Sequence, residues 1–185
     1  IHDLKMDHIA FDGYVMLTGQ LCTDGEKNVI FGNAIKPEMA DYLFNAFETK
    51  ELPLMMVEKD SLYVNMVNEV VEKAQEGISS PVPPVGEYTG APIYQMVSYG
   101  GKDLEELLAE KVPECKVTRW SPFGVDIISK SGGKVVGIEK MLEHYGLTKE
   151  EMIAFGDGEN DLEMLAFAGI GVAMANAETE AKEAA

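Results

Sequence analysis

Four acidic side chains lie within seven residues near the end of this sequence: Asp157, Glu159, Asp161 and Glu163. Two like charges about 5 Å apart repel each other by roughly 3 kcal/mol at an effective dielectric of ~20, and a bound cation would offset that repulsion. Asp157 also follows the apolar run 152–155, which is typical of a strand buried on both faces. Ligands of open α/β sheets bind at the carboxyl ends of such strands. We therefore predict Asp157 and Asp161 as metal ligands, and Mg²⁺ is the expected ion because it takes few carboxylates plus substrate oxygens.

These acidic residues have two other interpretations. Asn160 followed by Glu163 fits a capping box, and acidic residues in a first helical turn suit the helix dipole. That pattern accounts for Asn160, Asp161 and Glu163 without a cation, but it leaves Asp157 unexplained. A calcium-binding loop is excluded, because Leu162 stands where such a loop needs glycine.

Lys134 is the second residue that indicates chemistry. It follows Ser-Gly-Gly at 131–133 and begins a predicted helix, where a positive charge opposes the helix dipole. An anion such as phosphate, lying between the lysine and the helix end, would make that position favourable. The alternative is a solvated lysine at a frayed terminus. The segment is not a nucleotide-binding P-loop, since Ile128 replaces its first glycine and Val135 its Ser/Thr.

The elements that position these residues alternate between strand and helix. This order predicts βαβ units in a doubly wound parallel sheet, and therefore an α/β fold. The expected elements are strand 125–128, a helix from 134 to a cap at Gly146, strand 152–155, a short helix ending at Gly169, and strand 170–174.

The middle of the chain has a different pattern, which predicts a small α+β unit over residues 33–120. Residues 14–17 read as a buried strand, which we expect in the same sheet as the C-terminal third, with the middle unit inserted between them. Within the middle unit the expected helices are 37–50, 66–75 and 103–111, and the expected strands are 54–57, 62–65, 93–97 and 116–120.

Composition restricts the class of partner. With 15 basic and 32 acidic residues the formal net charge is −17, which disfavours nucleic acid and anionic membrane surfaces. No apolar run approaches the roughly 18–20 residues that span a bilayer. Cys22 and Cys115 form neither a metal-binding spacing nor a disulfide framework. We expect a soluble cytoplasmic protein without a nucleic-acid or membrane partner, and nothing here indicates an oligomeric state.

Lys134 and the segment 156–165 together resemble the haloacid-dehalogenase (HAD) superfamily, and within it the Cof-type sugar-phosphate phosphatases. In that family a lysine on a Gly-rich turn precedes Gly-Asp-Gly-x-Asn-Asp by about twenty residues, and residues 169–174 resemble the family's next strand. The resemblance covers 121–185 and, more weakly, 12–32. It implies a Rossmann-like HAD core with an inserted α/β cap. The implied division is 1–32 as partial core, 33–120 as cap and 121–185 as the C-terminal part of the core.

The resemblance also implies a reaction on small phosphorylated metabolites, sugar phosphates first. An aspartate attacks the phosphoryl group, Mg²⁺ and a lysine neutralise its oxygens, and water hydrolyses the aspartyl-phosphate. By motif, Lys134 is the phosphate-stabilising lysine and Asp157 a direct Mg²⁺ ligand. Asn160 contacts phosphate or orients Lys134, and Asp161 is an outer-shell acid.

One departure from the family concerns the nucleophile. The family's Asp-x-Asp-Gly motif and the Ser/Thr phosphate ligand that follows it are absent from this sequence, and at Asp12-Gly13 the position two residues upstream is Ala10. We therefore expect the nucleophile to lie outside this chain, and these 185 residues alone to be inactive. A phosphomutase of the same superfamily and a non-catalytic module that binds a phosphorylated ligand or a partner remain open alternatives.

Overall fold

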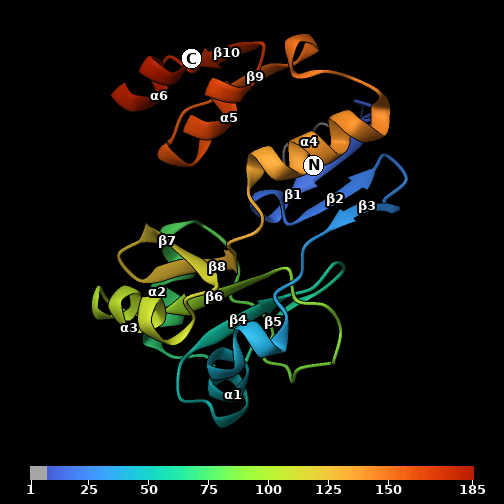
Figure 1. The fold of residues 1–185 in the computed structure, drawn as a ribbon. Helices are drawn as coiled ribbons and strands as arrows, with labels where there is room; N and C mark the ends of the chain where they lie inside the picture. Colours follow the sequence, from blue (N-terminus) through green and yellow to red (C-terminus); the bar gives the residue numbers. More distant parts are fainter. Residues whose placement is uncertain (1–7) are drawn as a thin grey trace. The chain divides into compact units, whose positions relative to one another are not determined.

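The computed structural model describes residues 8–185 (Figure 1), so the first seven residues of the expected segment 1–32 lie outside the described residues. The chain divides into two compact units. We call residues up to 32 together with 132–185 the discontinuous unit, and residues 33–131 the inserted unit. None of the helices in the described part of the chain has the length and apolar character needed to cross a membrane.

The discontinuous unit begins with three antiparallel strands in the order β1-β2-β3. They are β1 (Gly13–Met16), β2 (Leu21–Asp24) and β3 (Val29–Gly32), with a 3-10 turn at Leu17–Gly19. The expectation that strand 14–17 joins the sheet of the C-terminal third is wrong, because β1 pairs with β2 in a sheet of its own, separate from the sheet of the strands at 153–156 and 170–173. The physical reason is the short turn between β1 and β2, which reverses the chain and makes the two strands neighbours.

Helix α4 (Lys134–Tyr145) packs closely on that 3-10 turn. A Cβ atom on Gly137 would lie 2.8 Å from the Cα of Gly19, so the two backbones can approach only because both residues are glycine. Gly19 also has a φ of 79°, in the left-handed region that glycine favours. As predicted, α4 ends at Gly146, whose φ of 65° terminates the helix.

The C-terminal segment is a strand–helix–strand unit, and it bears out the α/β prediction. It consists of β9 (Ile153–Gly156), α5 (Leu162–Phe167), β10 (Ile170–Ala173) and α6 (Thr179–Ala184), with 3-10 turns at Lys149–Glu151 and Glu159–Asp161. β9 and β10 run parallel. The expectation that this strand is buried on both faces is wrong, because Ile153 and Phe155 are 57% and 63% exposed. Side chains alternate along a strand, and only the face with Ala154 packs in a buried cluster with residues of α5 and α6.

The inserted unit is a five-stranded antiparallel sheet in the order β5-β4-β6-β8-β7 with three helices. The side chain of Asn68 caps α2 (Glu69–Gly77) by accepting hydrogen bonds from the N–H groups of Val70 and Val71. The elements, after a 3-10 turn at Pro37–Met39, are α1 (Asp41–Thr49), β4 (Leu54–Val57), β5 (Leu62–Val64), α2 (Glu69–Gly77), β6 (Gln95–Tyr99), α3 (Asp103–Lys111), β7 (Cys115–Ser121) and β8 (Gly124–Ser129).

The inserted unit extends to Ser131, whereas the sequence predicts a boundary at 120/121. The sequence pattern places strand 125–128 in the parallel sheet, but this strand is β8, which pairs antiparallel with both β6 and β7. The cause is the tight connection between Ser121 and Gly124, which folds β8 back onto β7. An apolar strand carries the same local pattern in either sheet, so the pattern could not distinguish them.

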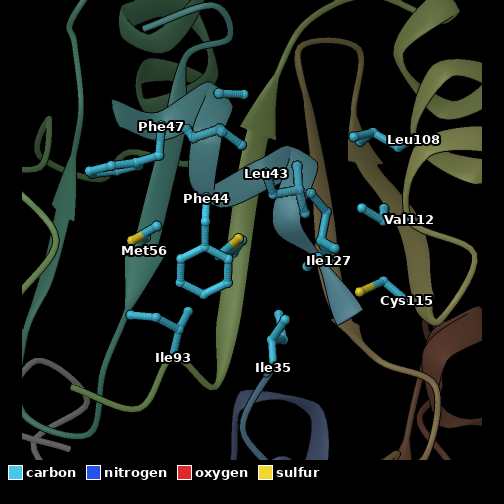
Figure 2. Close-up of a cluster of buried hydrophobic side chains, with 14 of the residues drawn as sticks. Ile35, Leu43, Phe44, Phe47, Met56, Ile93, Leu108, Val112, Cys115 and Ile127 are labelled. Carbon is cyan, nitrogen blue, oxygen red and sulfur yellow. The ribbon is translucent and has the colours of Figure 1, made fainter. Parts of the chain in front are cut away.

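The main core of the inserted unit lies on the face of the sheet that α1 and α3 cover. Leu43, Phe44 and Phe47 of α1 are part of this core, together with Met56 and Ile127 of the sheet (Figure 2). The opposite face carries a smaller buried cluster formed with α2, whose members are Val64, Val71, Ala74, Val97 and Tyr99. The sheet is therefore covered on both faces.

Candidate active site

Lys134 and Asp161 meet in the discontinuous unit although 27 positions separate them in the sequence. The Nζ atom of Lys134, the first residue of α4, donates a hydrogen bond to Oδ1 of Asp161 over 2.6 Å. The two side chains are only 25% and 12% exposed, so solvent screens this ion pair less than a surface pair. The structure thus brings together two of the four predicted site residues through their side chains.

Asp161 also binds the loop that follows β9. Its Oδ2 accepts hydrogen bonds from the backbone N–H groups of Asp157, at 3.1 Å, and Gly158, at 3.4 Å. Gly156 has to be glycine at this point, because a Cβ there would lie 2.6 Å from the Cβ of Asp161. One carboxylate therefore fixes the loop around Asp157 and the amine of Lys134 at the same time.

The pKa of Asp161 is lowered from its ordinary value of 3.8. Burial by itself raises the pKa of this carboxyl group, but the hydrogen bond from Lys134 and the backbone N–H donors outweigh that effect. Asp161 is therefore ionised at neutral pH and is the counter-ion of the Lys134 amine beside it.

Asp157 lies at the carboxyl end of β9 with an exposed side chain. Its Oδ2 accepts a hydrogen bond of 3.1 Å from Nδ2 of Asn176, and its backbone carbonyl accepts one of 3.0 Å from the N–H of Glu178. These contacts join the loop after β9 to the loop after β10. Sequence reasoning missed Asn176, although the rule that located Asp157 could have found it: parallel strands end at one sheet edge, and Asn176 follows β10.

Asn160 is exposed in the 3-10 turn between Asp157 and Asp161. The capping interpretation is wrong here, because α5 begins at Leu162 with Asp161, not Asn160, at its N-cap position. In the part of the chain that the structure describes, Asn160 makes no hydrogen bond to Lys134, so its predicted role toward phosphate stays a prediction.

The carboxylate oxygens in this site fit a magnesium ion whose other ligands are water and substrate. Over residues 8–185 there is no group of three or more His, Cys, Asp or Glu side chains able to enclose a metal. Mg²⁺ does not require such a group, because it keeps several waters and takes one or two carboxylates. Both oxygens of Asp161 already accept hydrogen bonds. The exposed Asp157 carboxylate is therefore the better candidate for direct contact with Mg²⁺. Asp161 supports this site by holding the backbone of the loop that carries Asp157.

Comparison with known proteins identifies the family of this chain. The family of haloacid dehalogenase-like hydrolases matches residues 1–185. YkrA, a proposed phosphatase of Bacillus subtilis (strain 168), is 28% identical over 185 residues, which are 97% of this chain and 70% of YkrA.

Two solved structures show the same fold. A protein of Geobacillus kaustophilus HTA426 matches with a TM-score of 0.88 and 29% identity, covering 99% of this chain and 72% of that one. The HAD subclass IIB sugar phosphatase BT4131 matches with a TM-score of 0.78 and 33% identity, covering 94% of this chain and 68% of BT4131. The chain therefore belongs to the haloacid dehalogenase-like hydrolases and, within them, to the phosphoric monoester hydrolases.

Proposed function

We propose that this chain is part of a magnesium-dependent phosphatase that hydrolyses small phosphorylated metabolites, sugar phosphates first. The observation that supports this proposal best is the contact of Lys134 with Asp161, whose other oxygen holds the backbone of Asp157. A fixed cation thus lies next to the loop that carries the candidate metal ligand. The sugar phosphatase named among the similar structures favours the same substrate class.

The role of Lys134 follows from its position. A phosphoryl group gains negative charge on its oxygens during transfer, and a preplaced cation stabilises that charge without reorganisation. Asp161 keeps the amine in place before substrate arrives. In the proposed site Lys134 binds and stabilises the phosphoryl oxygens. Asn160, in the turn that follows Asp157, would donate a further hydrogen bond to the phosphate.

The metal site we propose consists of Asp157, supported by Asp161. Asn176 restricts the orientation of the Asp157 carboxylate by donating to its Oδ2. When bound, Mg²⁺ supplies positive charge that polarises the phosphoryl group. We propose that the nucleophilic aspartate comes from residues outside this sequence and forms an aspartyl-phosphate that water hydrolyses. The inserted unit would then act as the cap that selects the leaving group.

The test is hydrolysis of p-nitrophenyl phosphate and hexose phosphates by the full-length protein that contains this chain. We expect turnover to stop with EDTA and to return with Mg²⁺. Lys134→Ala should lower kcat/KM by about 100-fold or more, as expected for the loss of a charge-stabilising group. Lys140→Ala is the matched control, because Lys140 lies on the same helix and pairs with Glu143 at the exposed surface; this variant should retain full activity.

Several outcomes would contradict the proposal. Turnover that persists without metal would exclude a role for Mg²⁺. Equal activity of the Lys134→Ala and Lys140→Ala variants would exclude a role for Lys134 in stabilising the phosphoryl group. Release of less free phosphate than substrate consumed would indicate a phosphomutase. The 185-residue chain alone should show no turnover, since its sequence lacks the nucleophile motif.

A further inference from the structure

The inserted unit contains a cavity of about 450 Å³ on the second face of its sheet, away from α1 and α3. Its walls are mainly apolar and include Met55 of β4, Val97 of β6 and the proline-rich segment 81–84. Every residue that lines it belongs to the range 33–131, so the cavity lies within one unit.

Asp126 of β8 places a carboxylate in this apolar wall. It lies opposite Val97 in the register of β6 and β8. Among residues 8–185 it forms no ion pair. Burial raises its pKa to about 6, although the neighbouring Gln95 and Trp120 favour the ionised form. Asp126 is therefore mostly ionised near pH 7, in an apolar setting and without a counter-ion.

The other titratable groups around the cavity do not compensate this charge. Tyr99 lines the cavity, and its hydroxyl accepts a hydrogen bond of 2.8 Å from Nε2 of Gln75. Lys73 of α2 is held 2.6 Å from Glu69, and Arg119 of β7 is held 2.7 Å from Glu105. The remaining charged side chains on the surrounding α2 and β7 are exposed, and they are Glu72, Glu76 and Lys116.

Trp120 forms an aromatic wall beside the carboxylate. A Cβ on Gly124 would lie 2.5 Å from Cζ2 of the indole, so the ring lies directly on the backbone of β8. Gly124 and Asp126 are two residues apart on one strand and therefore face the same side of the sheet. A cation held by Asp126 would also be near an indole ring, whose face attracts positive charge.

We propose that this cavity binds a small organic ammonium ion, with the ammonium group at Asp126 and the apolar body against Met55, Val97 and the prolines. A metal ion is a poor occupant, because a single carboxylate among apolar walls cannot replace its hydration shell. A neutral molecule would leave the Asp126 charge uncompensated. All the residues that line the cavity belong to the inserted unit, and the proposal does not rest on the proposed phosphatase activity.

Trp120 is the only tryptophan in the chain, so its fluorescence reports on this cavity alone. The experiment titrates the protein with cyclohexylmethylammonium chloride and, separately, with cyclohexylmethanol, which has the same apolar body without charge. At pH 8 we expect a saturable change in emission and at least about tenfold tighter binding of the ammonium ion than of the alcohol. The ammonium affinity should fall as the pH drops through about 6, because protonation removes the charge on Asp126.

Asp126→Asn should abolish the preference for the ammonium ion, while Asp60→Asn, at an exposed turn of the same unit, should retain it. Equal affinities for the two probes, no saturable change, or a preference that survives in Asp126→Asn would overturn the proposal. If Asp126→Asn does not fold, the wild-type pH profile decides: an ammonium affinity that stays constant from pH 8 to pH 5 would overturn it.

Discussion

Asp161 shows how much a single carboxylate can organise in this protein. Its two oxygens bind Lys134 and the backbone N–H groups of residues 157 and 158. Hydrogen bonds to charged groups contribute about 1.5–3 kcal/mol each, more than neutral ones. The ion pair is also partly shielded from water, so it differs from an exposed pair such as Lys140–Glu143. Asp161 is therefore a positioning residue for the candidate site as well as a structural one.

We predict that Asp161→Asn lowers the free energy of unfolding by about 1–2 kcal/mol, because Lys134 loses its counter-ion while the shape of the site is kept. Urea denaturation of the wild-type and variant chains measures the difference. Glu163→Gln, an exposed acid two positions further on, is the control and should change stability by less than about 0.5 kcal/mol. Equal shifts in the two variants would show that the Lys134–Asp161 pair contributes nothing specific.

The pH dependence of this pair follows from the sign of the shift. The folded-state pKa of Asp161 is below its ordinary value of 3.8, so the folded state binds its proton less readily than the unfolded state. The stability difference between wild type and Asp161→Asn should be constant above about pH 5. It should shrink as the pH falls through the unfolded-state and then the folded-state pKa. Unfolding free energies measured at several pH values test this, and a difference that grows in acid would contradict it.

Helix α4 is positioned by a contact that only small residues permit. Gly137 lies one turn beyond Lys134 and touches the backbone of Gly19, and the Sγ of Cys22 lies 3.5 Å from the Gly137 carbonyl oxygen. This contact places the first turn of α4, and therefore the Lys134 side chain, relative to the turn between β1 and β2. The direction of the helix thus depends on a glycine well inside it.

We predict that Gly137→Ala destabilises the chain by about 1–3 kcal/mol, because the new methyl group would lie 2.8 Å from the Cα of Gly19 and force the helix outward. Helix propensity alone predicts the opposite sign, a gain of about 1 kcal/mol. Gly77→Ala is the matched control, since Gly77 is in α2 and a Cβ there meets nothing within 4 Å. Urea midpoints for both variants show whether the clash with Gly19 or the gain in helix propensity is larger. Stabilisation by Gly137→Ala would contradict the close contact between Gly137 and Gly19.

At the scale of the whole molecule, the two units differ in the size of their buried apolar clusters. The inserted unit has a large cluster on one face of its sheet, whereas the buried cluster of the C-terminal segment consists of Ala154, Leu165, Ala177 and Ala181. Each unit also contains one buried cysteine, Cys22 in the discontinuous unit and Cys115 in the inserted unit. Burial raises the pKa of Cys22 to about 11 and also raises that of Cys115. Both thiols are therefore protected in the folded state.

We predict that both cysteines react with a thiol reagent at pH 8 only when their unit opens, and that Cys22 reacts faster than Cys115. The reason is that Cys115 is part of the large cluster, which costs more to expose. Single variants Cys22→Ala and Cys115→Ala separate the two rates, and complete labelling in urea is the control for access. Identical native-state rates would indicate that the chain opens as one cooperative unit.

Much of the local structure and part of the site can be predicted from the order of residues alone. Helix α3, the Gly146 cap of α4 and strand β4 follow from periodicity and capping residues, which act over a few positions. Lys134 and Asp157 were predictable because their charges are unfavourable without a ligand: Lys134 opposes the helix dipole, and Asp157 lies close to other acidic residues.

The contacts between distant segments could not be predicted in this way, because they arise from long-range packing. The pairing of β8 with β6, the bond from Asn176 to Asp157 and the position of Asp126 in an apolar wall all join residues far apart in the chain. A strand's apolar pattern reports that it is extended and buried, but not which strand lies beside it. Partners of that kind depend on the packing of the whole sheet, which no local pattern encodes.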